Sequence, residues 1–504
     1  MRGSRIALLR QIAAATLGSA VIAAPLAAQQ APARSTGAAP TLRFVAAQPN
    51  LPPASPPPPS VERLPSPAGA PETHRPVNVF PIDLPTALQL ADAENLQVAL
   101  AREQIRQAFA AQEQAQVLWL PSLRAGVHWN KHDGPLQESN GNIRDVSRTS
   151  LYSGFGGQAV GAGSPMIPGL WANFHLADAI FQPLAARQRT ASRSYAAGAT
   201  RNNILLDVSL AYLELLRAVQ DVRIAEEIRD KTGRLADLTQ AYARTGQGLR
   251  SDADRLRVEL LLREADLLRS REAVRVAGAR LAQMLRLDPC LCLEPLEPTI
   301  VPIEMVCNGD CCALVAQGLS TRPELAENRA LVAEAIEQMR RQRYAPLVPS
   351  LMLGASYGGF GGGMGDTIAN FDDRVDLDAT AYWELRNLGK GDSAARGLAQ
   401  SQVRQARIRQ MAMLDQVARE VAEAHAQVSA RRPQLAITQQ AVAVASESYG
   451  LNVVRIQEAQ GLPIEALQSV QALLQARRDY LRALIDYNAA QFTLHRALGW
   501  PISP

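Results

Sequence analysis

The sequence is built twice, and this duplication limits the possible folds more than any other feature. The tripeptide Pro121–Leu123 recurs as Pro349–Leu351, and the dipeptide Gly248–Leu249 recurs as Gly461–Leu462. The copies are 228 residues apart at the first pair and 213 residues apart at the second, so the first copy contains an insert of about 15 residues. Two similar units in tandem are therefore expected rather than one large core.

Each copy also contains one very long helix. In the first copy, apolar residues between 204 and 225 step by alternating fours and threes, which is the spacing of coiled coils. No proline interrupts residues 184–244, so this helix could span about 90 Å at about 1.5 Å per residue. The second copy repeats the pattern, with Pro433 expected to kink the helix. The partner helices are predicted over residues 251–286 and 464–498.

The N-terminus carries the features of an export signal. Three arginines within the first ten residues precede an uncharged apolar stretch, and small residues around Ala31 offer a cleavage site. Residues 1–33 are predicted to be a signal peptide, with an N-terminal membrane anchor as the alternative, and residues 34–80 a proline-rich linker. No later apolar run reaches 18 residues, so no transmembrane helix is expected.

Two pairs of amphipathic strands precede the long helices. They alternate apolar and polar residues with a period of two, which is typical of membrane β-barrel strands. Asp376 and Asp378 lie on the polar side of the last strand and are expected to face a lumen. The glycine-rich run 358–365 is interpreted as the loop that joins the second pair. The strands are predicted over about 121–131 and 170–181 in the first copy, and about 349–359 and 374–384 in the second.

Four strands per chain cannot close a barrel, because small barrels need about eight. An open sheet edge is also unfavourable in lipid, where each unpaired backbone group costs several kcal/mol. Several chains are therefore expected to pool their strands. A soluble sandwich is the alternative interpretation, but it would leave the long helices and the export signal unexplained.

All five cysteines lie between the two repeats. We place this connector at residues 290–312, between a first repeat at 81–289 and a second at 313–504. An exported protein meets an oxidising compartment, so disulfides are expected, and the odd number leaves one thiol free or intermolecular. A zinc site is the alternative, but the spacing fits no usual pattern. The cysteines are Cys290, Cys292, Cys307, Cys311 and Cys312.

No catalytic centre is recognisable in the sequence. The zinc-protease, serine-hydrolase and phosphate-loop motifs are missing. His128 and His132 have a four-residue spacing, but they fall on a predicted strand rather than a helix. Neither an enzyme nor a bound metal or cofactor is therefore expected. The formal net charge of +4 falls to about +1 without the three N-terminal arginines, which argues against nucleic-acid binding driven by phosphate attraction.

Four landmarks, in their order along the chain, carry a family resemblance. They are Leu84–Asn95, the two Pro-Ser-Leu strand entries, Thr321–Leu325 and Asp486–Gly499. On these landmarks the chain resembles the TolC family of outer-membrane efflux proteins, from Ile82 to Pro501. The resemblance implies a mainly α fold with a membrane β-barrel. Three chains would form a 12-stranded outer-membrane barrel, continued by a periplasmic α-helical barrel.

The resemblance also implies a function. Such a homotrimer would be the passive exit duct of a tripartite efflux or type I secretion system, embedded in outer-membrane lipid and extending into the periplasm. It would dock onto a periplasmic adaptor (membrane fusion) protein and an inner-membrane efflux pump or ABC transporter. An envelope structural coiled-coil protein without channel activity is the alternative, although such a rod has no need of amphipathic strand pairs.

Two turns between long helices match the periplasmic tips of the family. By this match Gly248, Leu249, Gly461 and Leu462 would contact the adaptor. The two glycines could also simply end their helices, and both interpretations can hold together.

Acidic residues after the second tip line the closed aperture in some members of the family. Glu465 is the nearest match by position. Gln468 stands where a second acid would be expected, which puts a gate of two acids in doubt. Asp252 is the counterpart of Glu465 in the first copy.

Overall fold

The computed structural model describes residues 79–120, 122–123, 125–155, 170–306, 309–458 and 460–502. All of these residues belong to one compact unit, His74–Pro504. The predicted signal peptide, almost all of the predicted linker and Cys307 lie outside the described residues.

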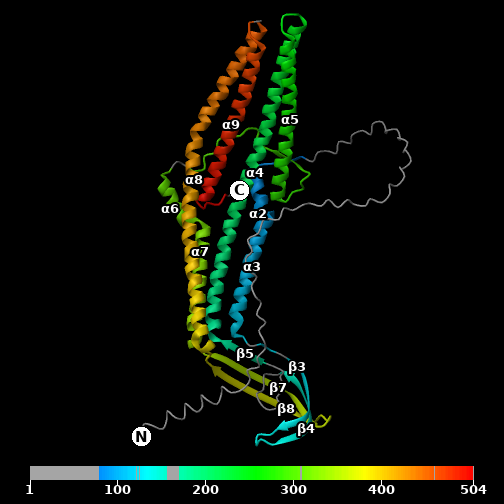
Figure 1. Cartoon of the computed structure of the whole chain (residues 1–504), viewed down its shortest axis with the longest axis vertical. Helices are drawn as coiled ribbons and strands as arrows, with labels where there is room; N and C mark the ends of the chain where they lie inside the picture. The colour runs from blue at the N-terminus through cyan, green and yellow to red at the C-terminus, as the bar shows by residue number, and fades with distance from the viewer. Residues whose placement is uncertain are drawn as a thin grey trace, which may run out of the picture. The chain divides into compact units, whose positions relative to one another are not determined.

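The two halves of this unit have the same order of helices, as Figure 1 shows. Two shorter helices come first, and a long helix and its return partner follow after the strands. The first half contains α2 Leu84–Glu94, α3 Leu96–Gln116, α4 Leu176–Arg244 and α5 Arg250–Leu285. The second half contains α6 Cys311–Thr321, α7 Pro323–Tyr344, α8 Lys390–Gln457 and α9 Pro463–Ala497. Short 3₁₀ turns are η1 Val117–Trp119, η2 Ala345–Leu347 and η3 Arg386–Gly389.

Helix α4 begins earlier than predicted. It comprises 69 residues and is therefore about 100 Å long at about 1.5 Å per residue. The prediction of a strand to residue 181 was wrong, because β5 ends at His175 and α4 follows directly, with Pro183 inside it. Asp178 in the first turn forms a bidentate ion pair with Arg341 of α7, at 2.6 and 2.9 Å. This contact, and the favourable position of an acid at a helix N-terminus, fix the start of α4.

The face of α4 that shows coiled-coil spacing is its buried face. Leu205, Val208 and Leu215 have no exposed surface and pack with residues of α2, α5 and α9. A second cluster joins α6, α8 and α9 around Val421 and Leu494. In the second half, Pro433 lies inside α8, which is assigned as one helix of 68 residues.

One antiparallel sheet contains six strand segments. They are β2 Ser122–Leu123, β3 Ala125–Gln137, β4 Ile143–Phe155, β5 Leu170–His175, β7 Ser350–Met364 and β8 Ala369–Tyr382. Strand β7 pairs with β4 and β5 on one side and with β8 on the other. Separately, β1 Val79–Ile82 pairs in parallel with β6 Cys292–Pro295.

Where two segments continue one another end to end, they form one line of the sheet, and the six segments therefore form four such lines. Phe155 at the end of β4 lies opposite Tyr357, and Leu170 at the start of β5 lies opposite Ala355. A single position of β7 therefore separates β4 from β5, and a single residue separates β2 from β3. The order of the lines is β2/β3, β4/β5, β7 and β8, so β2/β3 and β8 are the edges of the described sheet.

Strand β3 of the first copy is longer than predicted. Strand β3 continues to Gln137 and pairs along its whole length with β4. Strand β4 was missed because its sequence, IRDVSRTSLYSGF, has few apolar residues that could reveal a period of two.

The glycine-rich run predicted to be a loop lies largely in β7, and this prediction was wrong. The glycines lie where neighbouring strands approach closely. A Cβ atom on Gly358 would lie 2.6 Å from the carbonyl oxygen of Ser153, and one on Gly362 would lie 2.8 Å from that of Thr149. Glycine is therefore required here for close contact between strands rather than for a turn.

Candidate functional site

The two predicted tips have the same hydrogen bonds at equivalent residues. In the first turn, the N–H groups of Gln247 and Gly248 both donate to the carbonyl oxygen of Tyr242, at 3.0 and 3.1 Å. These bonds satisfy a carbonyl group at the end of a long helix. The equivalent bonds of the second turn run from Gln460 and Gly461 to Arg455, at 2.8 and 3.0 Å.

Each tip presents one exposed leucine. Leu249 and Leu462 are 68% and 60% exposed, and both have the extended backbone that precedes a helix. A Cβ atom on Gly248 or Gly461 would lie 3.2 or 3.1 Å from the nearest atom of the preceding helix. The leucines are therefore the side chains that a partner could contact, whereas the glycines allow the turns to close.

The predicted aperture residues lie at the start of the two return helices. Glu465 in the first turn of α9 forms an ion pair with Arg455 of α8 at 3.2 Å. Asp252 has the equivalent place in α5 and is half-buried, and Gln468 is exposed. The negative charge of Glu465 is therefore partly compensated within the chain.

The sheet has one apolar face that is open to the surroundings. The strand register places five large apolar side chains on this face, and their exposed fractions are between 57% and 79%. They are Val127, Trp129, Tyr357, Val375 and Leu377.

The opposite face of the sheet carries Asp376. Its carboxylate accepts hydrogen bonds from Arg374 at 2.8 Å and from the hydroxyl group of Ser356 at 3.3 Å. Asp378, the second predicted lumen residue, is two residues further along β8, and its side chain lies outside the described part of the structure. Tyr152 of β4 is also on this face and is only 2% exposed. This tyrosine was not predicted, because its strand was not.

The contacts between neighbouring helices show which helices lie at the two edges of the unit. Towards the tips, α4 contacts α5 and α9, and α8 contacts α9, so the order is α5, α4, α9, α8 (Figure 1). Towards the sheet the order is α3, α4, α7, α8. One edge therefore consists of first-half elements and the other of α8, and the sheet agrees, with β2/β3 and β8 at its edges.

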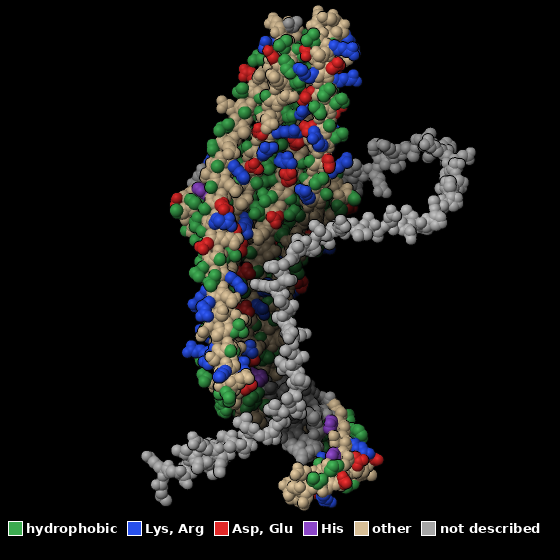
Figure 2. Space-filling view, viewed as in Figure 1, with side chains coloured by type: hydrophobic (Ala, Val, Ile, Leu, Met, Phe, Trp, Pro, Cys, Tyr) green, Lys and Arg blue, Asp and Glu red, His purple; other side chains and the backbone are tan. Residues whose placement is uncertain are grey.

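Exposed apolar side chains concentrate on these edge helices. On α8, Ile437, Val444 and Leu451 are 60–67% exposed and follow one another at steps of seven residues, the spacing of a coiled-coil seam. Leu268 of α5 and Leu96 of α3 are 67% and 62% exposed. By contrast, no large apolar side chain of the central helix α9 is exposed. Figure 2 shows hydrophobic side chains at the surface along the helices, between charged ones.

Ion pairs between helices were not predicted. Arg478 of α9 binds Asp221 of α4 and Asp266 of α5, each at 2.8 Å, so one guanidinium group joins three helices. Ser270 donates a further hydrogen bond to Asp221 at 2.7 Å. The arginine is 257 and 212 residues away from its two partners, so no local sequence pattern could have indicated these contacts.

The connector cysteines carry free thiols where they are described. The predicted disulfides are absent among Cys290, Cys292, Cys311 and Cys312. The first two lie at or beside β6, which pairs with β1, whereas the last two begin α6, which packs against α8. The two pairs of thiols are therefore held by different elements. Cys307 lies outside the described residues.

The described residues contain no group of three or more His, Cys, Asp or Glu side chains placed to hold a metal ion. None of the described helices contains a hydrophobic stretch long enough to cross a lipid bilayer.

Comparison with known proteins identifies the fold. No protein-family model and no curated protein sequence matches the chain. A membrane protein from Pseudomonas aeruginosa is similar with a TM-score of 0.70 at 18% identity, over 82% of this chain and 93% of that one. The outer-membrane channel CmeC of Campylobacter jejuni has a TM-score of 0.71 at 14% identity, over 82% and 85%. The outer-membrane protein VceC of Vibrio cholerae has a TM-score of 0.66 at 17% identity, over 83% and 96%. The chain therefore has the fold of the TolC-family outer-membrane channels.

Proposed function

We propose that this chain forms a homotrimeric channel in the outer membrane and serves as the passive exit duct of an efflux or secretion system. The observation that carries the proposal is the distribution of exposed apolar side chains. The edge helices α3, α5 and α8 carry large apolar side chains that are 60% or more exposed, whereas none on the central helices α4, α7 and α9 is more than 45% exposed. Exposed apolar stripes of this kind indicate a surface that another subunit covers. The fold shared with outer-membrane channels supports the same conclusion.

The two edges of the unit differ, so the subunits would join head to tail. The β8 edge of one copy would pair with the β2/β3 edge of the next, and α8 would pack against α3 and α5. Head-to-tail contacts form a ring when the rotation between subunits closes. Three copies of four strand lines would give a barrel of 12 strands. Its apolar face would meet lipid, and Asp376 and Asp378 would face the lumen.

We propose the tips as the docking site for a periplasmic adaptor, which would connect the duct to an inner-membrane efflux pump or ABC transporter. The support is the pair of exposed leucines, Leu249 and Leu462, which are held by equivalent turns. Glu465, with Asp252 and Gln468, would lie just inside the tips, where three-fold symmetry brings the copies together.

Electrical recording tests the proposed channel. Purified full-length protein, added to a planar lipid bilayer, should produce stepwise currents, and the cellular protein should be recovered in the outer-membrane fraction. The detergent buffer alone and heat-denatured protein are the controls. Recovery in the soluble periplasm without any current would contradict the proposal and would favour an envelope coiled-coil protein.

A further inference from the structure

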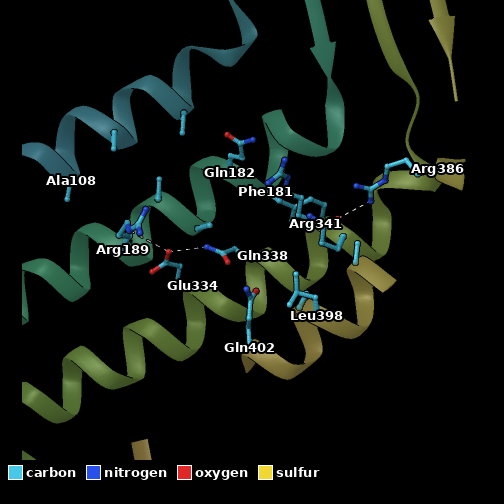
Figure 3. Close-up of a pocket in the computed structure, with 17 residues that line it drawn as sticks. Ala108, Phe181, Gln182, Arg189, Glu334, Gln338, Arg341, Arg386, Leu398 and Gln402 are labelled. Atoms are coloured by element: carbon cyan, nitrogen blue, oxygen red, sulfur yellow. Dashed lines mark hydrogen bonds and ion pairs between the residues drawn. The ribbon is translucent and has the colours of Figure 1, made fainter. Parts of the chain in front are cut away.

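A cavity of about 460 Å³ lies where four helices of one chain meet near the sheet (Figure 3). It is lined by α3, α4, α7, the beginning of α8 and the adjoining turn η3. The volume is within the range of pockets that bind small organic molecules, about 300–1,000 Å³. Both halves of the same chain supply the lining.

Part of the cavity wall is apolar and made of small side chains. Ala108 of α3, Ala186 of α4 and Ala399 of α8 line it, together with Phe181 and Leu398. Phe181 stacks on Tyr344, with ring centroids 5.7 Å apart and planes within 6°, so the position of its ring is fixed. Such a surface fits a flat or chain-like apolar body.

Two of the three arginines in the lining have strong partners. Arg341 is held by both oxygens of Asp178, at 2.6 and 2.9 Å. Arg386 binds Asp392 at 2.7 Å, and it also donates to the side-chain oxygen of Gln342 at 3.0 Å (Figure 3). The charges of these two guanidinium groups are therefore compensated by neighbouring carboxylates.

The third arginine, Arg189, is different. Its guanidinium approaches Glu334 only to 3.6 Å, and Arg189 donates no hydrogen bond to any described residue. The Arg189 side chain is 60% exposed, whereas that of Glu334 is 12% exposed and accepts a hydrogen bond from Gln338 at 3.1 Å. Burial raises the pKa of Glu334, against the opposing effect of Arg189 and Arg193.

We propose that this cavity binds amphiphilic organic anions, with the apolar body against the alanines and Phe181 and the acidic group on Arg189. A guanidinium group with free N–H donors is well suited to a carboxylate or a sulfonate. Gln182 and Gln402 also line the cavity and form no side-chain hydrogen bond within the described part of the chain, so their amide groups are available to the same ligand. The inference rests on the proposed function, because it names a class of molecule that would contact this cavity while it is exported through the duct.

Titration calorimetry on the full-length protein in lipid nanodiscs tests the inference. The probes are 1-naphthalenesulfonate, neutral 1-naphthalenemethanol and cationic 1-naphthylmethylammonium, and empty nanodiscs supply the background of lipid partitioning. We expect the anion to bind at least about tenfold more tightly than either of the other probes, as one charge-assisted hydrogen-bond pair would give. Equal affinities for the three probes would overturn the inference.

Two substitutions of opposite effect make the test specific. Arg189→Gln should weaken binding of the anion by about tenfold and leave the neutral probe unchanged, whereas Glu334→Gln should strengthen binding of the anion several-fold. Arg187→Gln is the matched control, since it removes the same charge from an exposed position of α4 outside the cavity. An equal loss in the Arg187 and Arg189 variants would show a general charge effect and would overturn the inference.

The two proposals can fail independently. A protein that conducts but shows no preference for the anion keeps the channel and loses the cavity site. A protein that binds the anion through Arg189 but carries no current keeps the site and loses the channel.

Discussion

Arg322, at the start of α7, is 3% exposed although it carries a full charge. It forms ion pairs with Glu324 at 2.8 Å and with Glu420 of α8 at 2.5 Å. Arg496 of α9 pairs with the same two carboxylates, at 3.1 and 2.8 Å. These four charges balance one another, so removing one of them leaves an uncompensated charge in a buried place.

Replacement of Arg322 by methionine should therefore be strongly destabilising. We expect a loss of about 3–5 kcal/mol in the free energy of unfolding, the range for breaking a buried ion pair on one side. Arg419→Met is the matched control, because its pair with Glu423 is exposed on both sides, and it should cost less than about 1 kcal/mol. Denaturant unfolding followed by circular dichroism measures the free energy of unfolding of both variants. Equal losses in the two variants would contradict the importance of the buried charge cluster.

The same cluster predicts a dependence on pH. Burial, the largest single cause, would raise the pKa of Glu324 and Glu420, but the hydrogen bonds that they accept, together with the charges of Arg322 and Arg496, hold both pKa values below the usual 4.5. A lowered pKa means that the stabilisation is complete above about pH 4.5 and is lost as the pH falls below it. Thermal unfolding between pH 7 and 3 should show this loss in the wild type. In the Arg322→Met variant, the unfolding temperature should fall less steeply over the same pH range. An equal fall in both proteins would contradict the assignment of the pH dependence to this cluster.

The tip leucines allow a test of docking that does not disturb the turns. Leu249→Asp and Leu462→Asp should each reduce adaptor-dependent export at least about tenfold, since each places a charge on an exposed apolar contact. The same variants should keep the single-channel current of the wild type. Leu296→Asp is the control, because Leu296 is 61% exposed in the connector and away from the tips. Full export by both tip variants would show that the tips do not dock the partner.

At the scale of elements, the glycines of β7 are a sensitive test of the sheet. Gly358→Ala should weaken the pairing of β7 with β4, because the new Cβ atom would lie 2.6 Å from a backbone oxygen that cannot move alone. Gly359→Ala is the matched control, since its Cβ atom would meet only the ring of Phe371 at 3.3 Å. We expect a loss of about 1–3 kcal/mol for the first and less for the second. Recovery of folded, heat-resistant protein compares the two, and equal recovery would contradict the described register.

Helices could be predicted from the sequence better than strands. The predicted bounds of α5 and α9 agree with the structure within one residue, because glycine and leucine turns end the long helices at both tips. Strand β4 has too few apolar residues to show its period, and the start of α4 depends on the pair between Asp178 and Arg341 across the fold. Sequence spacing did locate the tips, but it could not show that the glycines close the turns while the leucines are exposed.

At the scale of the whole molecule, the proposed assembly is argued from the edges of the unit. The edges of the sheet are β2/β3 and β8. The edge helices are α3 and α8 towards the sheet, and α5 and α8 towards the tips. At each level along the unit, one edge therefore comes from the first half and the other from the second half. Unpaired strand edges are costly in a bilayer, and exposed apolar seams on the edge helices are unfavourable in water. The proposed trimer would pair these strand edges and cover these apolar seams.

The mass of the purified complex in detergent tests this conclusion most directly. Native mass spectrometry of the solubilised protein, with circular dichroism to confirm that the strands are folded, gives the number of chains in the complex. The account predicts three chains and no stable folded monomer. A monodisperse monomer that keeps its β-structure would contradict it.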